Sequence, residues 1–246
     1  MRDERPPKAS LADSVYEQLK AMAVTYRFRP DERLNEMALA RQLNVSRTPL
    51  REALNRLVKE NLLTFRPKQG FRGRPLDAKE VFDLYELRKV LETTAGRLAV
   101  QRARDDEIVR LGEFLKTSLE APNEAPITYL LYLDEEFHER IARLSRNDEL
   151  VKTLANINAR IRFVRCIDME NGRRAKTQRE HKAVFEALKR RNADACAKII
   201  GHHITRRLDQ IVEVIKEGFA RIYVGEHPFD PSGPEAPTPA KEVPMS

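Results

Sequence analysis

The 246-residue sequence has no apolar run long enough to cross a bilayer, only two cysteines, and few glycines or prolines within its long amphipathic stretches. Without about 20 consecutive apolar residues we expect no membrane-spanning helix, and the charged start Met1–Arg5 is followed by no apolar signal-peptide segment. Cys166 and Cys196 lack the spacing of a metal motif and lie in apolar helical contexts. This pattern favours structural thiols in a cytoplasmic protein over a redox switch.

The charge is concentrated at one end of the chain. The whole sequence has 45 Lys and Arg against 38 Asp and Glu, whereas residues 1–76 have 16 against 9 and residues 77–246 have 29 of each. The entire excess of +7 therefore lies in the first third, as expected for a segment that binds a polyanion such as double-stranded DNA. A membrane-surface role would need a strongly amphipathic basic helix with bulky apolar anchors, and none stands out.

The stretch from Val45 to Val58 predicts a DNA recognition helix. Ser46 can cap it by accepting a hydrogen bond from an early backbone N–H, and Pro49 is tolerated in the first turn. Its apolar positions recur at helical spacing: Leu50, Ala53, Leu54, Leu57 and Val58. The opposite face carries side chains that can reach bases or phosphates in a major groove: Arg47, Thr48, Arg51 and Asn55. Taken alone, this stretch could also be an ordinary amphipathic surface helix.

The neighbouring segments favour a winged helix-turn-helix domain over residues 8–75. Two helices precede the recognition helix, the second joined to it by the short turn of Asn44 and Val45. Two β-prone runs follow, separated by a basic turn that contains Lys68 and Gly70, and they predict a hairpin wing along the phosphate backbone. The segments are 10–28 and 35–43 for the helices, 62–66 and 71–74 for the strands.

The remaining sequence predicts a second, all-α domain over residues 78–223. Its amphipathic runs indicate helices at about 78–103, 105–120, 125–145, 148–170, 174–191 and 193–222. No β-rich segment follows the wing. The tail 225–246 is rich in proline and poor in apolar residues, so we expect it to be disordered.

A possible metal site is spread over three of these helices. Asp134 and His138 are four residues apart, so they lie on one helix face and can reach the same ion. His181 and His203 lie on two further helices, and His203 is preferred to His202 because isoleucines flank it. An Asp/His₃ set suits Zn, Ni or Mn with positions left open for water or a ligand. The alternative is that each histidine is a surface or satisfied core residue.

The first domain resembles the DNA-binding domain of the GntR family of bacterial transcription regulators. The resemblance is carried by "LARQLNVSRTPLREALNRLVKENLLTFRPKQGF". It implies that Arg47, Thr48 and Arg51 contact operator DNA and that Gly70 marks the wing tip. The sequence departs from the family where Pro-Asp31 replaces the usual Pro-Gly and where Asn61 replaces the glycine of Glu-Gly-Leu.

The second domain resembles the FCD ligand-binding domain of the FadR-type branch of that family. The motifs are "YELRKVLETTAGRLA", "DEEFHERIARLSRND" and "EHKAVFEALKRRNADACAKIIGHHI". The resemblance implies a divalent metal held by Asp134, His138, His181 and His203. It also implies a dimeric, ligand-responsive regulator, expected to be a repressor, whose effector is a small organic or sugar acid.

A cationic side chain should neutralise the rest of such an effector. The resemblance points to Arg88, with Arg162 and Arg165 as further candidates, and a surface salt bridge is the alternative for each. Two other functions remain to be considered. One is a metalloenzyme that carries a DNA-binding module, and the other is an architectural DNA-binding protein with a structural metal. No nucleophile is placed by motif beside the proposed ligands, which weighs against the enzyme.

Overall fold

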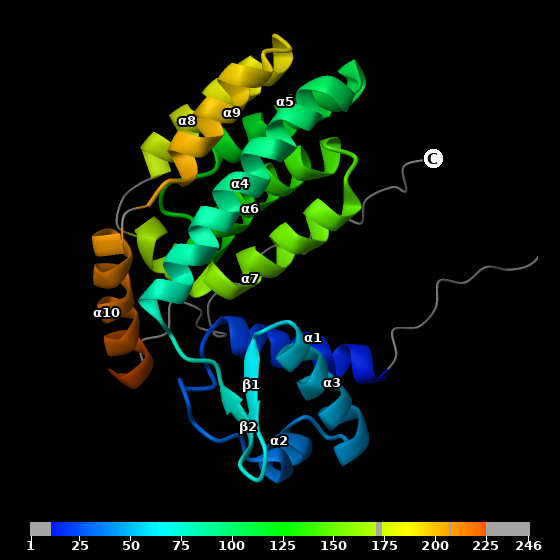
Figure 1. The fold of residues 1–246 in the computed structure, drawn as a ribbon, viewed down its shortest axis with the longest axis vertical. Coiled ribbons are helices and arrows are strands. Elements are labelled where there is room, and N and C mark those ends of the chain that lie inside the picture. The colour runs from blue at the N-terminus through cyan, green and yellow to red at the C-terminus, as the bar shows by residue number, and fades with distance from the viewer. Residues whose placement is uncertain (1–10, 171–173, 207, 225–246) are drawn as a thin grey trace, which may run out of the picture. The chain divides into compact units, whose positions relative to one another are not determined.

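The computed structural model describes residues 11–170, 174–206 and 208–224 (Figure 1). One compact unit holds the described residues up to Leu76 together with Ile222–Val224, and the other holds the described residues between Asp77 and Arg221. The tail expected to be disordered lies outside the described residues.

The first unit is a winged helix-turn-helix, as the sequence predicts. Its elements are α1 (Leu11–Val24), α2 (Glu36–Gln42), α3 (Arg47–Lys59), β1 (Leu63–Arg66) and β2 (Gly70–Gly73). Helix α1 packs on α3, and the two antiparallel strands form the wing (Figure 1). The predicted apolar face of α3 is buried: Leu50, Leu54 and Leu57 are 0% exposed and Ala53 is 1% exposed. The exposed face is therefore free to meet another molecule.

The start of α3 differs from expectation in one respect. Ser46 occupies the N-cap position with an extended backbone, but its side chain makes no capping hydrogen bond. The third helical residue, whose N–H an N-cap serine commonly binds, is Pro49, which has no N–H. The proline that suits the first turn thus removes the partner that Ser46 was expected to have.

Two positions that depart from the family pattern keep the backbone conformation that glycine favours. Asp31 has a φ of 57° and Asn61 also has a φ of 57°. Asp and Asn enter this left-handed region more readily than other residues with a Cβ. Both turns therefore keep their conformation without glycine, and the departures leave the fold unchanged.

The second unit is an all-α bundle, as predicted. Its helices are α4 (Ala78–Arg102), α5 (Asp105–Glu120), α6 (Ile127–Leu144), α7 (Asp148–Glu170), α8 (Arg174–Lys189), α9 (Ala193–Ile204) and α10 (Leu208–Val224) up to Arg221. Helix α4 packs against α6, α7, α8 and α9, so it lies at the centre of the bundle (Figure 1). In the described part of the chain, no helix is both long and apolar enough to cross a membrane.

The prediction of one long helix over 193–222 was wrong. Helix α9 ends at Ile204, and the next residue, Thr205, has an extended ψ of 126°. Arg206 then donates hydrogen bonds to the backbone oxygens of His203 and Thr205 and pairs with Asp168 of α7 at 2.9 Å. This tertiary ion pair and capping arrangement, rather than a glycine or proline, stabilises the break.

Candidate metal centre and DNA-binding helix

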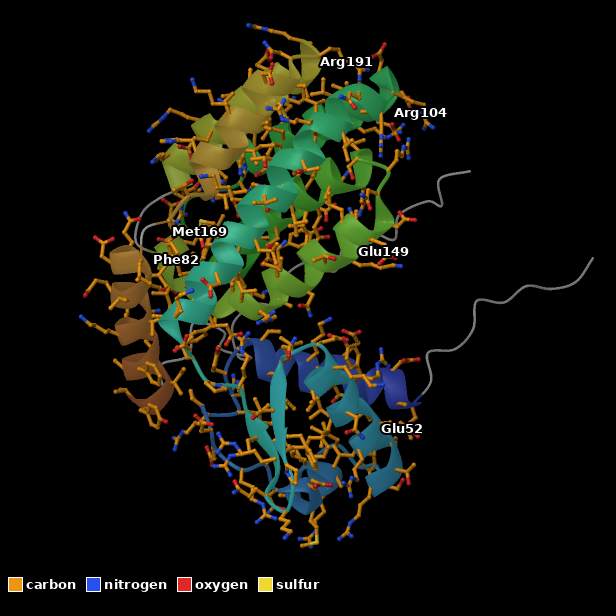
Figure 2. The ribbon with its side chains drawn as sticks, viewed as in Figure 1. Glu52, Phe82, Arg104, Glu149, Met169 and Arg191 are labelled. Atoms are coloured by element: carbon orange, nitrogen blue, oxygen red, sulfur yellow. The ribbon has the colours of Figure 1, made fainter. Side chains whose placement is uncertain are left out.

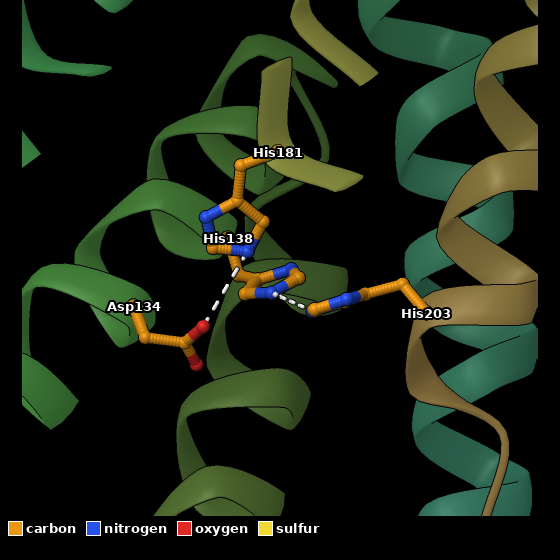
Figure 3. A group of neighbouring side chains, drawn as sticks. All are labelled: Asp134, His138, His181 and His203. Carbon is orange, nitrogen blue, oxygen red and sulfur yellow. Dashed lines mark hydrogen bonds and ion pairs between the residues drawn. The ribbon is translucent and has the colours of Figure 1, made fainter. Parts of the chain in front are cut away.

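Three helices bring four potential metal ligands to one point inside the second unit. Asp134 and His138 come from α6, His181 from α8 and His203 from α9 (Figure 3). One ligand atom from each lies within 4.8 Å of all the others. All four side chains are at most 9% exposed. The neighbouring His202 is exposed and lies outside this cluster, which follows from the turn of about 100° between adjacent residues of a helix.

Two of the histidines are oriented by carboxylates. Nδ1 of His138 lies 2.5 Å from Glu92 Oε2, and Nδ1 of His203 lies 2.7 Å from Glu180 Oε2. His203 Nδ1 is hydrogen-bonded to Glu180, and a carboxylate beside Nδ1 favours the tautomer that carries the proton there and leaves Nε2 as an acceptor. The two Nε2 atoms lie 3.2 Å apart, facing each other (Figure 3). Two facing lone pairs repel unless a cation lies between them, so this geometry suits a shared metal ion.

The other two members of the cluster have unpaired polar atoms. Asp134 Oδ1 and His181 Nε2 are buried without a hydrogen-bond partner, and they lie 3.4 Å apart. Buried polar atoms without a partner cost about 1–3 kcal/mol each. A divalent cation would satisfy both atoms and both facing Nε2 atoms, so the residues present fit a metal ion.

The buried charges around the cluster keep the ligands in the state that a metal needs. Burial raises the pKa of the Asp134 carboxyl, but Arg165 and the neighbouring histidines outweigh it, so the pKa is lowered and Asp134 is ionised. Burial lowers the pKa of His181 well below its ordinary value, which keeps the ring neutral. Burial also lowers the pKa of His203, although the hydrogen bond to Glu180 opposes this. An ionised carboxylate and neutral imidazoles are the metal-binding forms.

A small cavity adjoins the cluster. Its walls include Asp134 and His203 and three arginines, Arg88, Arg165 and Arg206. Its volume is about 30 Å³, room for little more than water. Asp134 also lines a second cavity together with Leu130, Leu133 and Arg174, and Met169, labelled in Figure 2, lines both cavities. The first cavity is thus lined by three arginines and the second by one arginine and two leucines.

The three arginines expected near the effector differ in their positions. Arg88 and Arg165 line the cavity, and each pairs with a buried carboxylate: Arg88 with Glu92 at 2.5 Å and Arg165 with Asp134. Arg162 is not among the lining residues, and its side chain is 33% exposed and pairs with Glu135 at 3.2 Å. All three arginines thus form ion pairs, and the effector role of Arg162 stays a prediction.

Sequence reasoning missed three residues of this region, namely Glu92, Glu180 and Arg206. Two weak signals were present: Glu180 directly precedes His181, and Glu92 lies four residues after Arg88 on the same helix face. Arg206 gave no signal, because it was placed inside a continuous helix that in fact ends two residues earlier.

The side chains proposed to bind DNA lie on the accessible side of the first unit. On α3 the exposed residues include Arg47, Thr48, Arg51 and Asn55. Lys68 lies in the turn between the strands, and Gly70, with a φ of 82°, is the first residue of β2 and pairs with Arg66. The structure thus presents all six residues on the solvent-exposed helix face or at the wing turn, where a duplex could reach them.

Comparison with known families and proteins identifies both units. The family of bacterial regulatory proteins named gntR matches residues 11–72, and the FCD domain matches residues 83–206. The chain is 50% identical over 202 residues to the Nta operon transcriptional regulator of Aminobacter aminovorans, covering 82% of this chain and 95% of that protein. It is 34% identical over 205 residues to the uncharacterized HTH-type transcriptional regulator YdhC of Bacillus subtilis, covering 82% and 92%.

Solved structures show the same fold. The structure of E. coli McbR/YncC has a TM-score of 0.64 and 24% identity, covering 89% of this chain and 99% of that one. A putative transcriptional regulator GntR from Rhodococcus sp. RHA1 has a TM-score of 0.61 and 21% identity, covering 88% and 98%. At these identities the likeness concerns the fold alone.

Proposed function

Since the chain belongs to the GntR family of bacterial regulatory proteins and carries an FCD domain, we propose that it is a repressor whose DNA binding responds to a small carboxylate through a metal centre. It is a DNA-binding transcription regulator rather than an enzyme, because the similar proteins are named as regulators. The enzyme and architectural alternatives are not favoured by any observation in the described residues.

The proposed metal ligands are Asp134 Oδ1 and one ring nitrogen from each of His138, His181 and His203. The observation that carries this proposal is the pair of Nε2 atoms of His138 and His203, which face each other at 3.2 Å with a carboxylate beside each Nδ1. Hard oxygen with imidazole nitrogen suits Zn, Ni or Mn. A bound ion would supply open coordination positions for an anionic ligand.

The effector is proposed to be a small organic or sugar acid that enters the cavity beside Asp134. Arg88 and Arg165 would balance its remaining charge, and Arg206 is a third guanidinium on the same wall. Because the cavity is only about 30 Å³, an acid must widen it by displacing side chains. The ion pair of Arg206 with Asp168 is more exposed than those of Arg88 and Arg165, at 15% and 19% side-chain exposure, so it should yield most readily of the three. Since Arg206 also caps α9, effector binding would loosen the junction between α9 and α10.

The proposed readout is the binding of a homodimer to a near-palindromic operator. Arg47, Thr48, Arg51 and Asn55 would enter the major groove, and Lys68 and Gly70 would bring the wing to the backbone. An effector acts by binding one conformation better than another, so its binding would change the population that fits both half-sites.

The test is operator binding with and without metal. DNase footprinting of the region upstream of the chain's own gene should show a near-palindrome, and acids processed by neighbouring gene products should release the protein from it. Release should require added Zn, Ni or Mn and should fail after chelation, while operator binding without effector persists. Release by an acid from chelated protein would contradict the metal-dependent mechanism. A footprint without two-fold symmetry would contradict the dimer.

A further inference from the structure

A hollow on the first unit is lined by an arginine that lies on neither the recognition helix nor the wing. The hollow has a volume of about 580 Å³ and lies between the start of α2 and the first turns of α3. Its walls carry three arginines and one carboxylate: Arg33, Arg47, Arg51 and Glu36. Only two of these arginines belong to α3.

The segment that carries Arg33 runs beside the wing. Leu34 N–H donates to Phe71 O at 2.9 Å, Gly73 N–H donates to Glu32 O at 3.0 Å, and Arg33 forms an antiparallel bridge with Arg72. Leu34 is 8% exposed, whereas Arg33 is exposed, as alternation along an extended segment requires. The backbone therefore holds Arg33 on the outer side of this edge.

The guanidinium of Arg33 lies between the wing turn and α3. Its Nε is 3.9 Å from where a Cβ of Gly70 would be, so it adjoins the first residue of β2. Glu36 Oε2 lies 3.5 Å from Arg51 Nε, and Glu36 Oε1 lies 4.0 Å from the same Cβ position of Gly70. Among the described residues, Arg33 has no ion pair or side-chain hydrogen bond. An exposed guanidinium without an ion-pair partner, beside the proposed recognition helix and the wing, is placed to bind a polyanion.

We propose that Arg33 is a further DNA-binding residue, which contacts a backbone phosphate between the recognition helix and the wing. A phosphate suits this position because the guanidinium offers several N–H donors in a fork and the hollow is open to solvent. This inference rests on the proposed role of α3. Contacts of this kind set the register of the protein on the duplex without reading sequence.

The test is the salt dependence of binding, measured by fluorescence anisotropy with a footprinted operator and with a random duplex. Arg33→Ala should weaken binding to the operator and to the random duplex by a similar factor, about tenfold. It should also lower the slope of log K against log[salt] by about 0.9. Arg33→Lys should restore the slope. The matched control is Lys59→Ala, which removes one exposed positive charge from the other end of α3 and should leave the slope unchanged.

Three outcomes would overturn the proposal. The first is an unchanged salt slope for Arg33→Ala at an unchanged melting temperature. The second is an equal loss of DNA affinity in Lys59→Ala. The third is a loss of affinity for the operator but not for the random duplex, which would indicate a base contact instead. Arg47→Ala separates this proposal from the assignment of α3. If Arg47→Ala weakens operator binding and Arg33→Ala does not, only the role of Arg33 is wrong.

Discussion

Removal of the metal should destabilise the wild-type protein and leave the variant His181→Ala nearly unaffected. The proposed ligands come from α6, α8 and α9, so a bound ion joins three helices of the bundle. Binding to the folded state alone stabilises it by RT ln(1 + [L]/Kd), which is about 2.7 kcal/mol at a hundredfold excess over Kd. For a chain of this length that corresponds to a shift in Tm of about 5–10 °C.

The assay is thermal unfolding of protein purified without chelators, then dialysed against EDTA, then reloaded with Zn, Ni or Mn. The Tm of the wild type should fall after EDTA treatment and recover when the metal is added back. His181→Ala also loses the stacking of the ring on Phe137, at 4.1 Å between centroids, so its Tm can be lower throughout. The decisive quantity is therefore the shift on chelation rather than the Tm itself.

The control variant is His202→Ala, which removes an exposed histidine next to His203 and should keep the full shift. Operator binding without effector should survive in His181→Ala, since DNA is bound by the other unit. If wild type contains no divalent metal by elemental analysis and melts identically with chelator and with each added ion, the three histidines are core residues and the metal centre is wrong.

Three further predictions concern single residues. Glu92→Gln should weaken metal binding about 10–100-fold, as measured by metal titration with the exposed Glu149→Gln as control. Arg47→Ala should cost about 1–3 kcal/mol in operator binding and relax specificity at one base pair, if the guanidinium contacts a guanine. Asn61→Ala should cost about 1 kcal/mol of unfolding free energy at its φ of 57°, whereas Asn61→Gly should be near neutral. Equal losses for both Asn61 variants in denaturant unfolding would contradict this reading of the turn.

The periodicity of apolar residues was sufficient to predict the fold class and most helices, because burial of one helix face is a local property of the sequence. The apolar face of α3 is an example, since Leu50, Leu54 and Leu57 are fully buried as expected. The break after Ile204 was not predictable in this way. It depends on the pairing of Arg206 with Asp168, residues 38 positions apart, and no local helix-breaking residue marks it.

The candidate metal site was predictable only in part. The spacing of Asp134 and His138 places them on one helix face, but nothing local shows that α8 and α9 bring His181 and His203 to the same point. The family resemblance supplied that step, and the structure brings the four residues together. Whether Arg88, Arg162 or Arg165 faces the cavity depends on helix rotation and packing, which is why Arg162 was expected there and Arg206 was not.

Buried ion pairs lie between the proposed sites for the metal ion and the acid effector in the second unit. Arg88 donates to Glu92 Oε1, and the other oxygen of that carboxylate lies beside His138 Nδ1. Arg165 likewise pairs with Asp134. If the proposed acid draws either guanidinium toward itself, it would leave the paired carboxylate freer to act on the proposed metal side, directly for Asp134 and through His138 for Glu92, and this should strengthen metal binding. Because binding free energies are reciprocally linked, the metal must then raise the affinity for the acid by the same factor. We therefore expect the proposed metal and effector to bind cooperatively, with Asp134 and Glu92 as the residues that couple them.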